Sequence, residues 1–300
     1  MCRHLAYLGP PVSLRSVLID PPFGLYRQAW APRRQRHGTV NADGFGIGWY
    51  AEGDPIPARY RRASPMWGDG SLPDLARVVR SAAVLAAVRS ATAGMALGEA
   101  AVAPFASGRW LFSHNGVLDG WPASAEALAV PASAERASVP ASAERASVPA
   151  SAQQPSVPAR AERASVPGSA EQPSVPNKAF SLFSLEAMVD SAFLWALVLG
   201  RLEAGDPPEA ALAETIVAIE AAGGTGRFNF LMTDGQSVVG TAAGDTLWYR
   251  QADGAVIVSS EPGDNGPGWT EVPDRQVLTA APDRVTVRPL TTHTERIAVR

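Results

Sequence analysis

A tandem repeat divides this chain of 300 residues into two ordered parts. Proline recurs every nine positions from Pro131 to Pro176, in motifs such as Val-Pro-Ala-Ser-Ala-Glu-Arg-Ala-Ser. Each unit offers no aromatic residue and little valine, so it lacks the apolar surface needed to offset the chain entropy lost on folding. A short period also occurs in solenoids, but nothing in this unit would fill a stacked core. We therefore expect residues 123–178 to be disordered.

The insertion does not require two separate domains. Ordered sequence resumes on both sides of it, and a long surface loop adds little to the entropy of chain closure. With 46% hydrophobic residues, the chain can bury a sizeable core. We expect residues 2–122 and 179–300 to form a single domain, with the nine-residue repeat inserted in one of its loops.

The spacing of apolar residues predicts strands, then helices, then strands along this domain. Short apolar runs bounded by Gly, Pro or Asp indicate strands, and spacings of three and four residues indicate helices. Before the insertion these are strands at 3–8, 44–51, 83–90 and 109–114, and helices at 13–19 and 73–82. After it we expect two packed helices, the second over 208–222, then strands at 227–233, 237–241, 246–250, 255–259 and 276–280. Few βαβ alternations occur, which predicts an α+β layered fold.

Charge and hydropathy argue against several classes of partner. The net charge is −3 and the densest basic run, residues 33–36, is short, so the electrostatic footprint of a nucleic-acid-binding protein is missing. No apolar run reaches the roughly 18 residues of a membrane span, and the N-terminus lacks the features of a signal peptide. We expect a cytoplasmic protein that binds neither nucleic acid nor membrane. The sequence does not define an oligomeric state.

Metal and cofactor sites are not indicated either. His4, His37, His114 and His293 are scattered, without partners at the spacing of metal ligands. The glycine-rich segment 41–50 lacks the lysine and the spacing of a phosphate-binding loop. Its alternation of glycine with large residues instead lets another backbone pack closely. We expect no metal and no cofactor.

The single cysteine, Cys2, is the second residue of the chain. If Met1 is removed, which a small second side chain generally permits, the thiol and an α-amine that titrates near pH ~8 share one residue. This is the N-terminal nucleophile arrangement, in which the amine serves as general base for the thiol. The position alone favours an ordinary small residue in a frayed terminus, so the catalytic interpretation depends on other residues.

Asn115 and Gly116 follow an apolar strand and could supply an oxyanion hole. The side-chain amide of Asn115 and the backbone N–H of Gly116 could converge on the oxyanion of a tetrahedral intermediate, because glycine allows close approach. The alternative is a plain Asn-Gly turn, which is common.

Arg89 stands at the end of an apolar run that resembles a buried strand, where its charge needs a partner. A substrate carboxylate bound through two hydrogen bonds would supply that partner, and Thr92 could add a hydroxyl. An internal Asp or Glu would serve equally well, and the sequence does not decide between these alternatives.

Asp190 lies near the start of the first helix after the insertion. Either the helix begins near residue 184 and contains Asp190, or it begins at Asp190 with that residue as the N-cap. The carboxylate would bind a substrate ammonium only if it faced the site. Local sequence favours a capping or surface role.

In order along the chain, these elements resemble the class II glutamine amidotransferases of the N-terminal nucleophile superfamily. The matching segments are the opening Met1-Cys2-Arg3-His4, the segment 41–50, Arg89-Ser90-Ala91-Thr92, His114-Asn115-Gly116 and Asp190-Ser191. They cover nearly all the ordered chain. The opening residues 2–11 together with segment 39–46 look most like the γ-glutamyl hercynylcysteine S-oxide hydrolases of ergothioneine biosynthesis.

The resemblance implies a four-layer αββα fold and a stand-alone hydrolase without a cofactor. It implies that Cys2 attacks the γ-carbonyl of a small γ-glutamyl substrate and that Asn115 and Gly116 stabilise the oxyanion. It further implies that Arg89 holds the α-carboxylate and Asp190 the α-ammonium of the glutamyl group. Water then releases glutamate from the thioester.

Two positions depart from the wider superfamily. Where a Cys-His-Pro-Phe segment is common, this chain has Val102-Ala103-Pro104-Phe105, and Val88 stands where a histidine is often found beside the arginine. Two alternative functions remain: a general glutaminase or hydrolase of another γ-glutamyl compound, and a non-catalytic protein whose repeat recruits partners.

Overall fold

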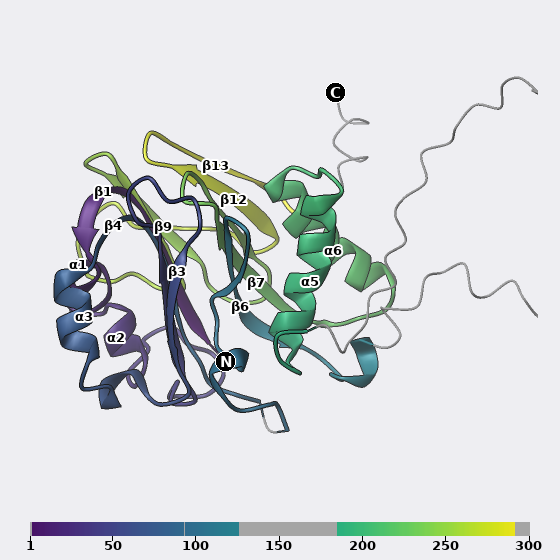
Figure 1. Ribbon diagram of the computed structural model, residues 1–300. Coiled ribbons are helices and arrows are strands. Elements are labelled where there is room, and N and C mark those ends of the chain that lie inside the picture. The colour runs from purple at the N-terminus through teal and green to yellow at the C-terminus, as the bar shows by residue number, and fades with distance from the viewer. Residues whose placement is uncertain (1, 93, 126–184, 292–300) are drawn as a thin grey trace, which may run out of the picture. The chain divides into compact units, whose positions relative to one another are not determined.

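The computed structural model describes residues 2–92, 94–125 and 185–291 (Figure 1). Residues 126–184 lie outside these ranges, and with them most of the segment expected to be disordered. Residues 123–125 belong to a helical turn in which Ala125 is buried, so ordered chain extends past residue 122. The described residues on the two sides of the gap form one compact unit.

Two antiparallel sheets make up the centre of this unit. Sheet A has the order β11-β9-β10-β1-β4-β2-β3, and sheet B has the order β13-β12-β8-β7-β6-β5. Sheet A consists of β1 (Arg3–Ser13), β2 (Phe45–Trp49), β3 (Ala58–Arg62), β4 (Arg80–Val88), β9 (Trp248–Ala252), β10 (Ala255–Ser259) and β11 (Thr270–Glu271). Sheet B consists of β5 (Phe105–Ser107), β6 (Trp110–Leu118), β7 (Gly226–Thr233), β8 (Val238–Ala242), β12 (Gln276–Ala281) and β13 (Arg284–Pro289).

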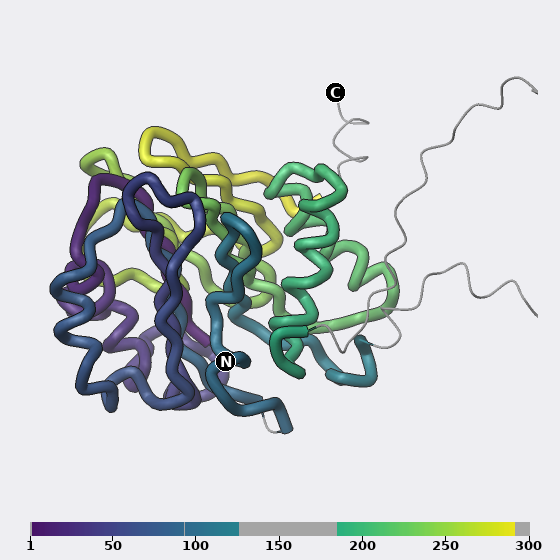
Figure 2. Tube along the Cα trace, viewed as in Figure 1, coloured from purple at the N-terminus to yellow at the C-terminus, as the bar shows by residue number. Residues whose placement is uncertain are grey.

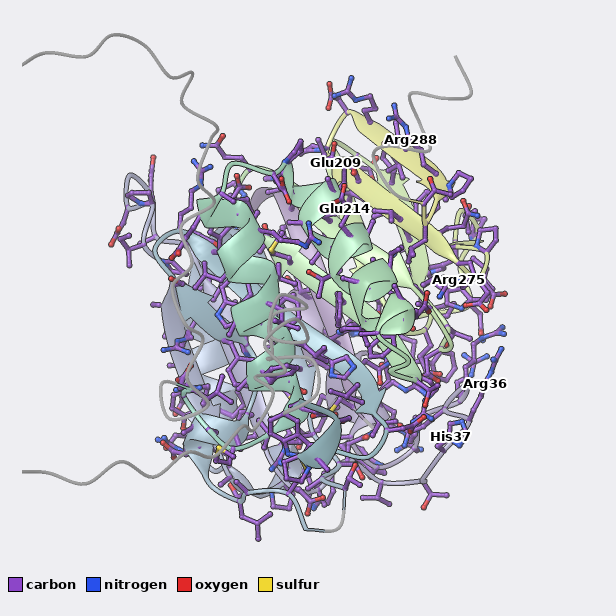
Figure 3. All side chains as sticks on the ribbon, turned by 90° about the vertical axis from the view of Figure 1, so that its right-hand side faces the viewer. Arg36, His37, Glu209, Glu214, Arg275 and Arg288 are labelled. Atoms are coloured by element: carbon purple, nitrogen blue, oxygen red, sulfur yellow. The ribbon has the colours of Figure 1, made fainter. Side chains whose placement is uncertain are left out.

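Helices cover the outer face of each sheet. Sheet A is covered by α1 (Leu14–Leu18), α2 (Leu25–Gln28) and α3 (Leu72–Val78), with the short turns η1 (Met66–Gly68) and η2 (Glu99–Ala101) in connecting segments. Sheet B is covered by α5 (Asp190–Glu203) and α6 (Pro208–Ala221), which lie in front of it in Figure 3. The layers are therefore helix, sheet, sheet, helix, and the predicted αββα fold is confirmed.

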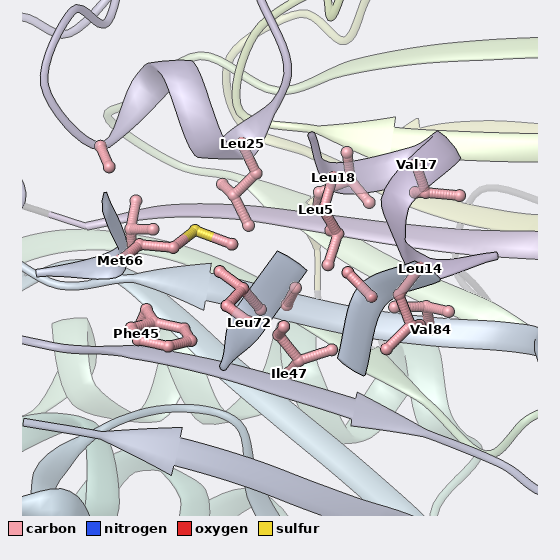
Figure 4. Close-up of a cluster of buried hydrophobic side chains, with 14 of the residues drawn as sticks. Leu5, Leu14, Val17, Leu18, Leu25, Phe45, Ile47, Met66, Leu72 and Val84 are labelled. Atoms are coloured by element: carbon pink, nitrogen blue, oxygen red, sulfur yellow. The ribbon is translucent and has the colours of Figure 1, made fainter. Parts of the chain in front are cut away.

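The alternation of side chains along each strand divides the core between these layers. In β1, Leu5 and Tyr7 pack under the helices of sheet A. Leu5 is labelled in the view of this cluster in Figure 4. Ala6 and Leu8 point the other way, into the apolar core between the two sheets. Residues at even positions near the start of β1 therefore face sheet B.

Most predicted elements are present, but several boundaries were wrong. β1 extends to Ser13, beyond the predicted end at residue 8, and β6 extends to Leu118, beyond residue 114. The helix predicted at 73–82 ends at Val78, because Val79 is extended and its carbonyl accepts the backbone N–H of Leu14 at 3.0 Å. β4 then begins at Arg80. The strands β3, β5, β11 and β13 and the helix α2 were not predicted. β3 carries three arginines in five residues, a composition untypical of a strand.

Within the part of the chain that the structure describes, no helix combines the length and the apolar character needed to cross a bilayer.

Candidate active site

Inward-facing residues of β6 contact successive residues of sheet A along the strand. On β6, the alternate residues Leu111, Ser113 and Asn115 face sheet A. A Cβ added at Gly48 of β2 would lie 2.6 Å from the Leu111 side chain, so these residues are in contact. Two residues further along β6, Ser113 Oγ lies 3.2 Å from His4 Nδ1 of β1. Successive inward residues of β6 therefore approach the start of β1.

Pairing within sheet A places Cys2 beside Arg89. Arg3 of β1 pairs with Val88 of β4, and the next step of this antiparallel register sets Cys2 opposite Arg89. On the other side of Arg89, its backbone N–H donates to the carbonyl of Gly44 at 2.8 Å. Ser113 lies opposite His4, and Asn115 is the next residue of β6 that faces sheet A. Asn115 therefore lies at the end of the sandwich where Cys2 and Arg89 are paired. In Figure 2, β1 begins at the lower end of the sandwich, where α5 also begins.

Asn115 and Gly116 lie inside β6 and do not form a turn. Asn115 is fully buried, and neither atom of its side-chain amide has a hydrogen-bond partner among the described residues. A buried unpaired polar group costs about 1–3 kcal/mol, so this amide is held ready to bond at a cost to stability. A Cβ at Gly116 would collide with the carbonyl oxygen of Arg227 on the neighbouring strand. Glycine is therefore required for β6 to approach β7 here.

Arg89 has no internal acidic partner in the described part of the chain. Its side chain is 7% exposed, and Nη2 donates to the carbonyl of Ala96 at 2.9 Å. Nη1 is buried and makes no hydrogen bond to any described residue. Of the two alternatives that the sequence left open, an internal Asp or Glu partner is therefore absent among residues 2–92, 94–125 and 185–291.

Asp43 holds the segment that carries Arg89. Its Oδ2 accepts the backbone N–H of Ala91 at 2.8 Å, and its own N–H donates to the carbonyl of Arg89 at 2.9 Å. Thr92 follows this segment and its side chain is exposed. The glycine-rich segment that contains Asp43 therefore positions the residues that follow β4. This role adds to the close backbone packing that the sequence predicted.

Asp190 is the first residue of α5, and Val189 is the N-cap. Of the two predicted helix starts, the one at Asp190 is confirmed, but Asp190 is the first helical residue and not the N-cap. Its Oδ1 accepts the N–H of Ser191 at 2.7 Å, and its Oδ2 accepts the N–H of Leu118 at 3.0 Å. The bond from Leu118 ties the start of α5 to the end of β6, three residues beyond Asn115 in sequence. Asp190 is 6% exposed, so it is not a surface residue.

Comparisons with known proteins show the family of the chain. The sequence profile of the class II glutamine amidotransferases matches residues 16–134. A protein named γ-glutamyl-hercynylcysteine sulfoxide hydrolase from Mycolicibacterium smegmatis is 35% identical over 97% of this chain and 100% of its own length. The chain belongs to the class II glutamine amidotransferase family. A second such hydrolase, from Mycobacterium tuberculosis strain H37Rv, is 37% identical over 97% of both chains.

Solved structures show the same amidotransferase fold. A class II domain protein from Silicibacter pomeroyi has a TM-score of 0.58 at 23% identity, covering 97% of this chain and 100% of that one. The glutamine phosphoribosylpyrophosphate amidotransferase from B. subtilis has a TM-score of 0.56 at 14% identity, covering 97% of this chain and 49% of that one. At these identities the likeness concerns the fold alone.

Two histidines of this amidotransferase-family chain are buried next to the candidate site. Burial lowers the pKa of His4 from 6.5 to about 3, so its imidazole is neutral at physiological pH. Burial also lowers the pKa of His114, whose Nε2 lies 2.9 Å from the carbonyl of Arg227 and whose Nδ1 lies 3.1 Å from Ser191 Oγ. Since a carbonyl only accepts, Nε2 of His114 carries the proton.

Arg3 fixes the loop that leads to the glycine-rich segment. It is fully buried, its Nε donates to Gln35 Oε1 at 3.2 Å, and it lies 4.0 Å from Glu261 Oε1. Glu261 Oε2 in turn accepts the backbone N–H groups of Arg33 and Arg34, each at 2.8 Å. Burial lowers the pKa of Arg3, while the charge of Glu261 opposes that effect. The short basic run is therefore part of the protein's own framework.

The two departures from the superfamily lie in different environments. Val88 belongs to the cluster under the helices of sheet A, on the face of β4 opposite to Arg89. Ala103 contacts β2 through its backbone, because a Cβ at Gly46 would collide with the Ala103 carbonyl oxygen. Arg61 Nη1 donates to the adjacent carbonyl of Val102 at 3.3 Å. Contacts to the backbone of Val102 and Ala103 thus hold this segment, which lacks the histidine common in the wider superfamily.

Sequence reasoning did not single out Ser113, Asp43 or the role of His4. Period-two alternation could have found the first and the last, since His4 shares a strand face with Cys2 and Ser113 shares one with Asn115. Among residues 2–92, 94–125 and 185–291, no group of three or more His, Cys, Asp or Glu side chains is arranged to hold a metal ion.

Proposed function

We propose that the protein is a γ-glutamyl hercynylcysteine S-oxide hydrolase, an amidohydrolase of ergothioneine biosynthesis with Cys2 as its nucleophile. The observation that carries this proposal is an identity of 35–37% with three proteins of that name over 97% of this chain. In the proposal, residues 2–122 and 179–300 act as one catalytic domain and the repeat between them is an insertion.

The site supports this chemistry because its charges suit a glutamyl group. The head of that group carries an α-carboxylate and an α-ammonium, which need one fixed cation and one fixed anion. Arg89 offers a buried Nη1 that has no partner among the described residues, and Asp190 is a buried carboxylate at the start of α5. We assign the carboxylate to Arg89, with Thr92 adding a hydroxyl, and the ammonium to Asp190.

In the proposed reaction the α-amine of Cys2, freed by loss of Met1, takes the thiol proton. The sulfur then attacks the γ-carbonyl carbon, and the carbonyl electron pair moves to oxygen. The Asn115 amide and the Gly116 N–H bind that oxyanion. Collapse of the intermediate breaks the C–N bond, and the ammonium of Cys2 returns its proton to the departing amine. A γ-glutamyl thioester remains on Cys2.

Hydrolysis of the thioester completes the cycle. The Cys2 amine takes a proton from water, whose oxygen adds to the thioester carbonyl at the same oxyanion site. The C–S bond breaks, which releases glutamate and restores the thiol. No other cysteine occurs in the chain, so a covalent intermediate on sulfur identifies Cys2 directly.

The decisive experiment measures glutamate release from γ-glutamyl hercynylcysteine S-oxide by the wild-type protein and by Cys2→Ala. We expect release by the wild type and none above background by the variant. Release by Cys2→Ala at the wild-type rate would refute the thioester mechanism. Intact mass spectrometry of the purified protein checks that Met1 has been removed, and a retained Met1 would contradict the role of the amine.

A parallel assay with glutamine tests the substrate assignment. We expect a higher kcat/KM for the sulfoxide than for glutamine. A preference for glutamine would instead identify a general glutaminase, with the same nucleophile and the same glutamyl site.

A further inference from the structure

A hydrogen bond joins the two sheets at the level next to the candidate site. His4 Nδ1 on β1 and Ser113 Oγ on β6 are 3.2 Å apart, and both residues are buried. His4 lies two residues from Cys2 on the same face of its strand. Ser113 lies two residues from Asn115 on the same face of the other strand. The pair therefore links the strand of the nucleophile to the strand of the oxyanion donor.

The backbones at both ends of this bond are fixed by their own sheets. The N–H of His4 donates to Ser260 Oγ at 3.0 Å, and the N–H of Ser260 donates to the carbonyl of His4 at 2.9 Å. On the other side of β1, His4 pairs with Ala87 of β4. Ser113 pairs with Leu231 of β7. A displacement at either end therefore moves the strand, and the neighbouring catalytic group moves with it.

Much of the remaining contact between the sheets is apolar and does not fix their relative position as sharply. A second buried polar contact, from the Tyr50 hydroxyl just after β2 to the carbonyl of Thr233 in β7 at 3.0 Å, lies toward the other end of the sheets. Ala6, Leu8, Leu111 and Leu231 belong to the core between the sheets, where the hydrophobic effect is non-directional. A hydrogen bond tolerates a much smaller displacement, because it weakens steeply with poor geometry and leaves buried polar groups unpaired when broken. The His4–Ser113 pair is the polar contact that lies beside the candidate site, and it thus sets the register of the sheets where chemistry would occur.

We propose that His4 and Ser113 are positioning residues, whose hydrogen bond sets the separation between the Cys2 sulfur and the Asn115 amide. This inference rests on the proposed function, since it assigns no group that touches substrate. Breaking the bond leaves Arg89 and Asp190 in place, so substrate binding persists while stabilisation of the oxyanion is lost. The burial that keeps His4 neutral makes the bond independent of pH near neutrality.

The test compares Ser113→Ala with Ser113→Thr, which keeps the hydroxyl. Since a misplacement of about 1 Å can cost a hundredfold in rate, we expect Ser113→Ala to lower kcat by about tenfold or more with KM within about threefold of wild type. Ser113→Thr should recover most of the kcat. The pH profile of kcat should keep its shape in both variants.

A matched control separates positioning from general loss of stability. Ser81 is a buried serine toward the other end of the sheets, and its Oγ bonds to the backbone of Tyr50 and Ala83. Ser81→Ala should lower the melting temperature as Ser113→Ala does but leave kcat near that of the wild type. An equal loss of kcat in the two variants, or a KM that rises as kcat falls, would overturn the proposal.

A thiol-labelling measurement makes the test independent of turnover. Iodoacetamide alkylates the thiolate without using the oxyanion site. In a diazoketone analogue of glutamine, the diazo-bearing carbon takes up a proton and alkylates the sulfur with loss of N2, while the ketone oxygen occupies the oxyanion site. We expect Ser113→Ala to react with iodoacetamide at the wild-type rate and with the analogue at least about tenfold more slowly. Equal rates with the analogue would overturn the proposal. If the wild type released no glutamate from the sulfoxide, the proposed function would fail while this measurement still tested the positioning.

A second pair of variants applies if Ser113→Ala does not fold. His4→Asn carries a polar atom where the histidine has Nδ1, and His4→Gln carries one where it has Nε2. We expect His4→Asn to retain much of the reactivity toward the analogue and His4→Gln to lose it. Equal reactivity of these two variants would contradict the proposed bond.

Discussion

Asp43 and Ala91 are joined by a hydrogen bond of 2.8 Å, from the Ala91 N–H to the Asp43 carboxylate. Asp43 also donates its own N–H to the carbonyl of Arg89. One residue of the glycine-rich segment thus holds the chain on both sides of Ser90. These contacts fix the backbone that carries the guanidinium we assign to the substrate carboxylate.

Asp43→Ala should raise KM for the γ-glutamyl substrate about tenfold, with a smaller change in kcat. A hydrogen bond to a charged group contributes about 1.5–3 kcal/mol, and tenfold in affinity corresponds to about 1.4 kcal/mol. Asp43→Asn keeps an acceptor oxygen and should show a smaller increase. Steady-state kinetics on the three proteins checks this, and an unchanged KM in Asp43→Ala would contradict the role given to the contact.

Arg89→Lys should raise KM about a hundredfold although the charge is kept. Lysine offers a point charge in place of the planar fork that binds a carboxylate through two parallel bonds, and truncating a buried charged pair costs about 2–5 kcal/mol. Arg77→Lys, at an exposed position of α3, serves as the control and should leave KM as in the wild type. A wild-type KM in Arg89→Lys would show that the carboxylate is bound elsewhere.

Asp190→Asn should abolish the preference for ligands that carry an α-ammonium. The wild type should bind L-glutamate more tightly than glutarate, which lacks the amino group, because only the former pairs with the carboxylate of Asp190. The variant should bind the two with similar affinity. Competitive inhibition constants for both ligands test this, and a preference retained by Asp190→Asn would assign the ammonium to another group.

The buried His4 should make the fold less stable at acidic pH. Its pKa is lowered by burial from 6.5 to about 3, so below pH 6.5 the unfolded chain takes up a proton that the folded chain does not. The free energy of unfolding is therefore complete above pH 6.5 and falls by about 1.4 kcal/mol per pH unit below it, about 2 kcal/mol by pH 5. The lowered pKa of His114 acts in the same direction.

Urea denaturation of the wild type and of His4→Asn at pH 7 and pH 5 measures this contribution. The variant should lose about 2 kcal/mol less over that interval. Equal losses in the two proteins would mean that His4 is protonated in the folded state.

Gly116→Ala should destabilise the protein and remove its activity. The added Cβ would collide with the Arg227 carbonyl oxygen, so β6 and β7 must separate beside Asn115. Overpacking of this kind typically costs about 1–3 kcal/mol. Gly70→Ala is the control, because nothing lies within 4 Å of a Cβ at that position. Melting temperatures and kcat of both variants test the prediction, which a wild-type kcat in Gly116→Ala would contradict.

Local pattern predicted much of the layered fold. Helical spacing predicted α6 at 208–222, where the structure has Pro208–Ala221. Alternation between turn signals predicted β10 at 255–259, where the structure has the same bounds. Local pattern did not predict β3. The arginines of this strand lie at a sheet edge, where charged side chains reach solvent and form ion pairs with Glu186 and Glu99. Edge strands need little apolar surface, so periodicity does not mark them.

The sequence alone indicated the residue types of the proposed site: a thiol at position 2, an arginine after a buried strand, and an Asn-Gly pair at 115–116. These are visible because chemistry requires particular side chains at particular strand ends. Tertiary structure alone decided that Asn115 lies within a strand, that Arg89 lacks an internal acid in the described chain, and that His4 meets Ser113. Such facts depend on pairings between segments far apart in sequence, and no local pattern encodes which strand faces which.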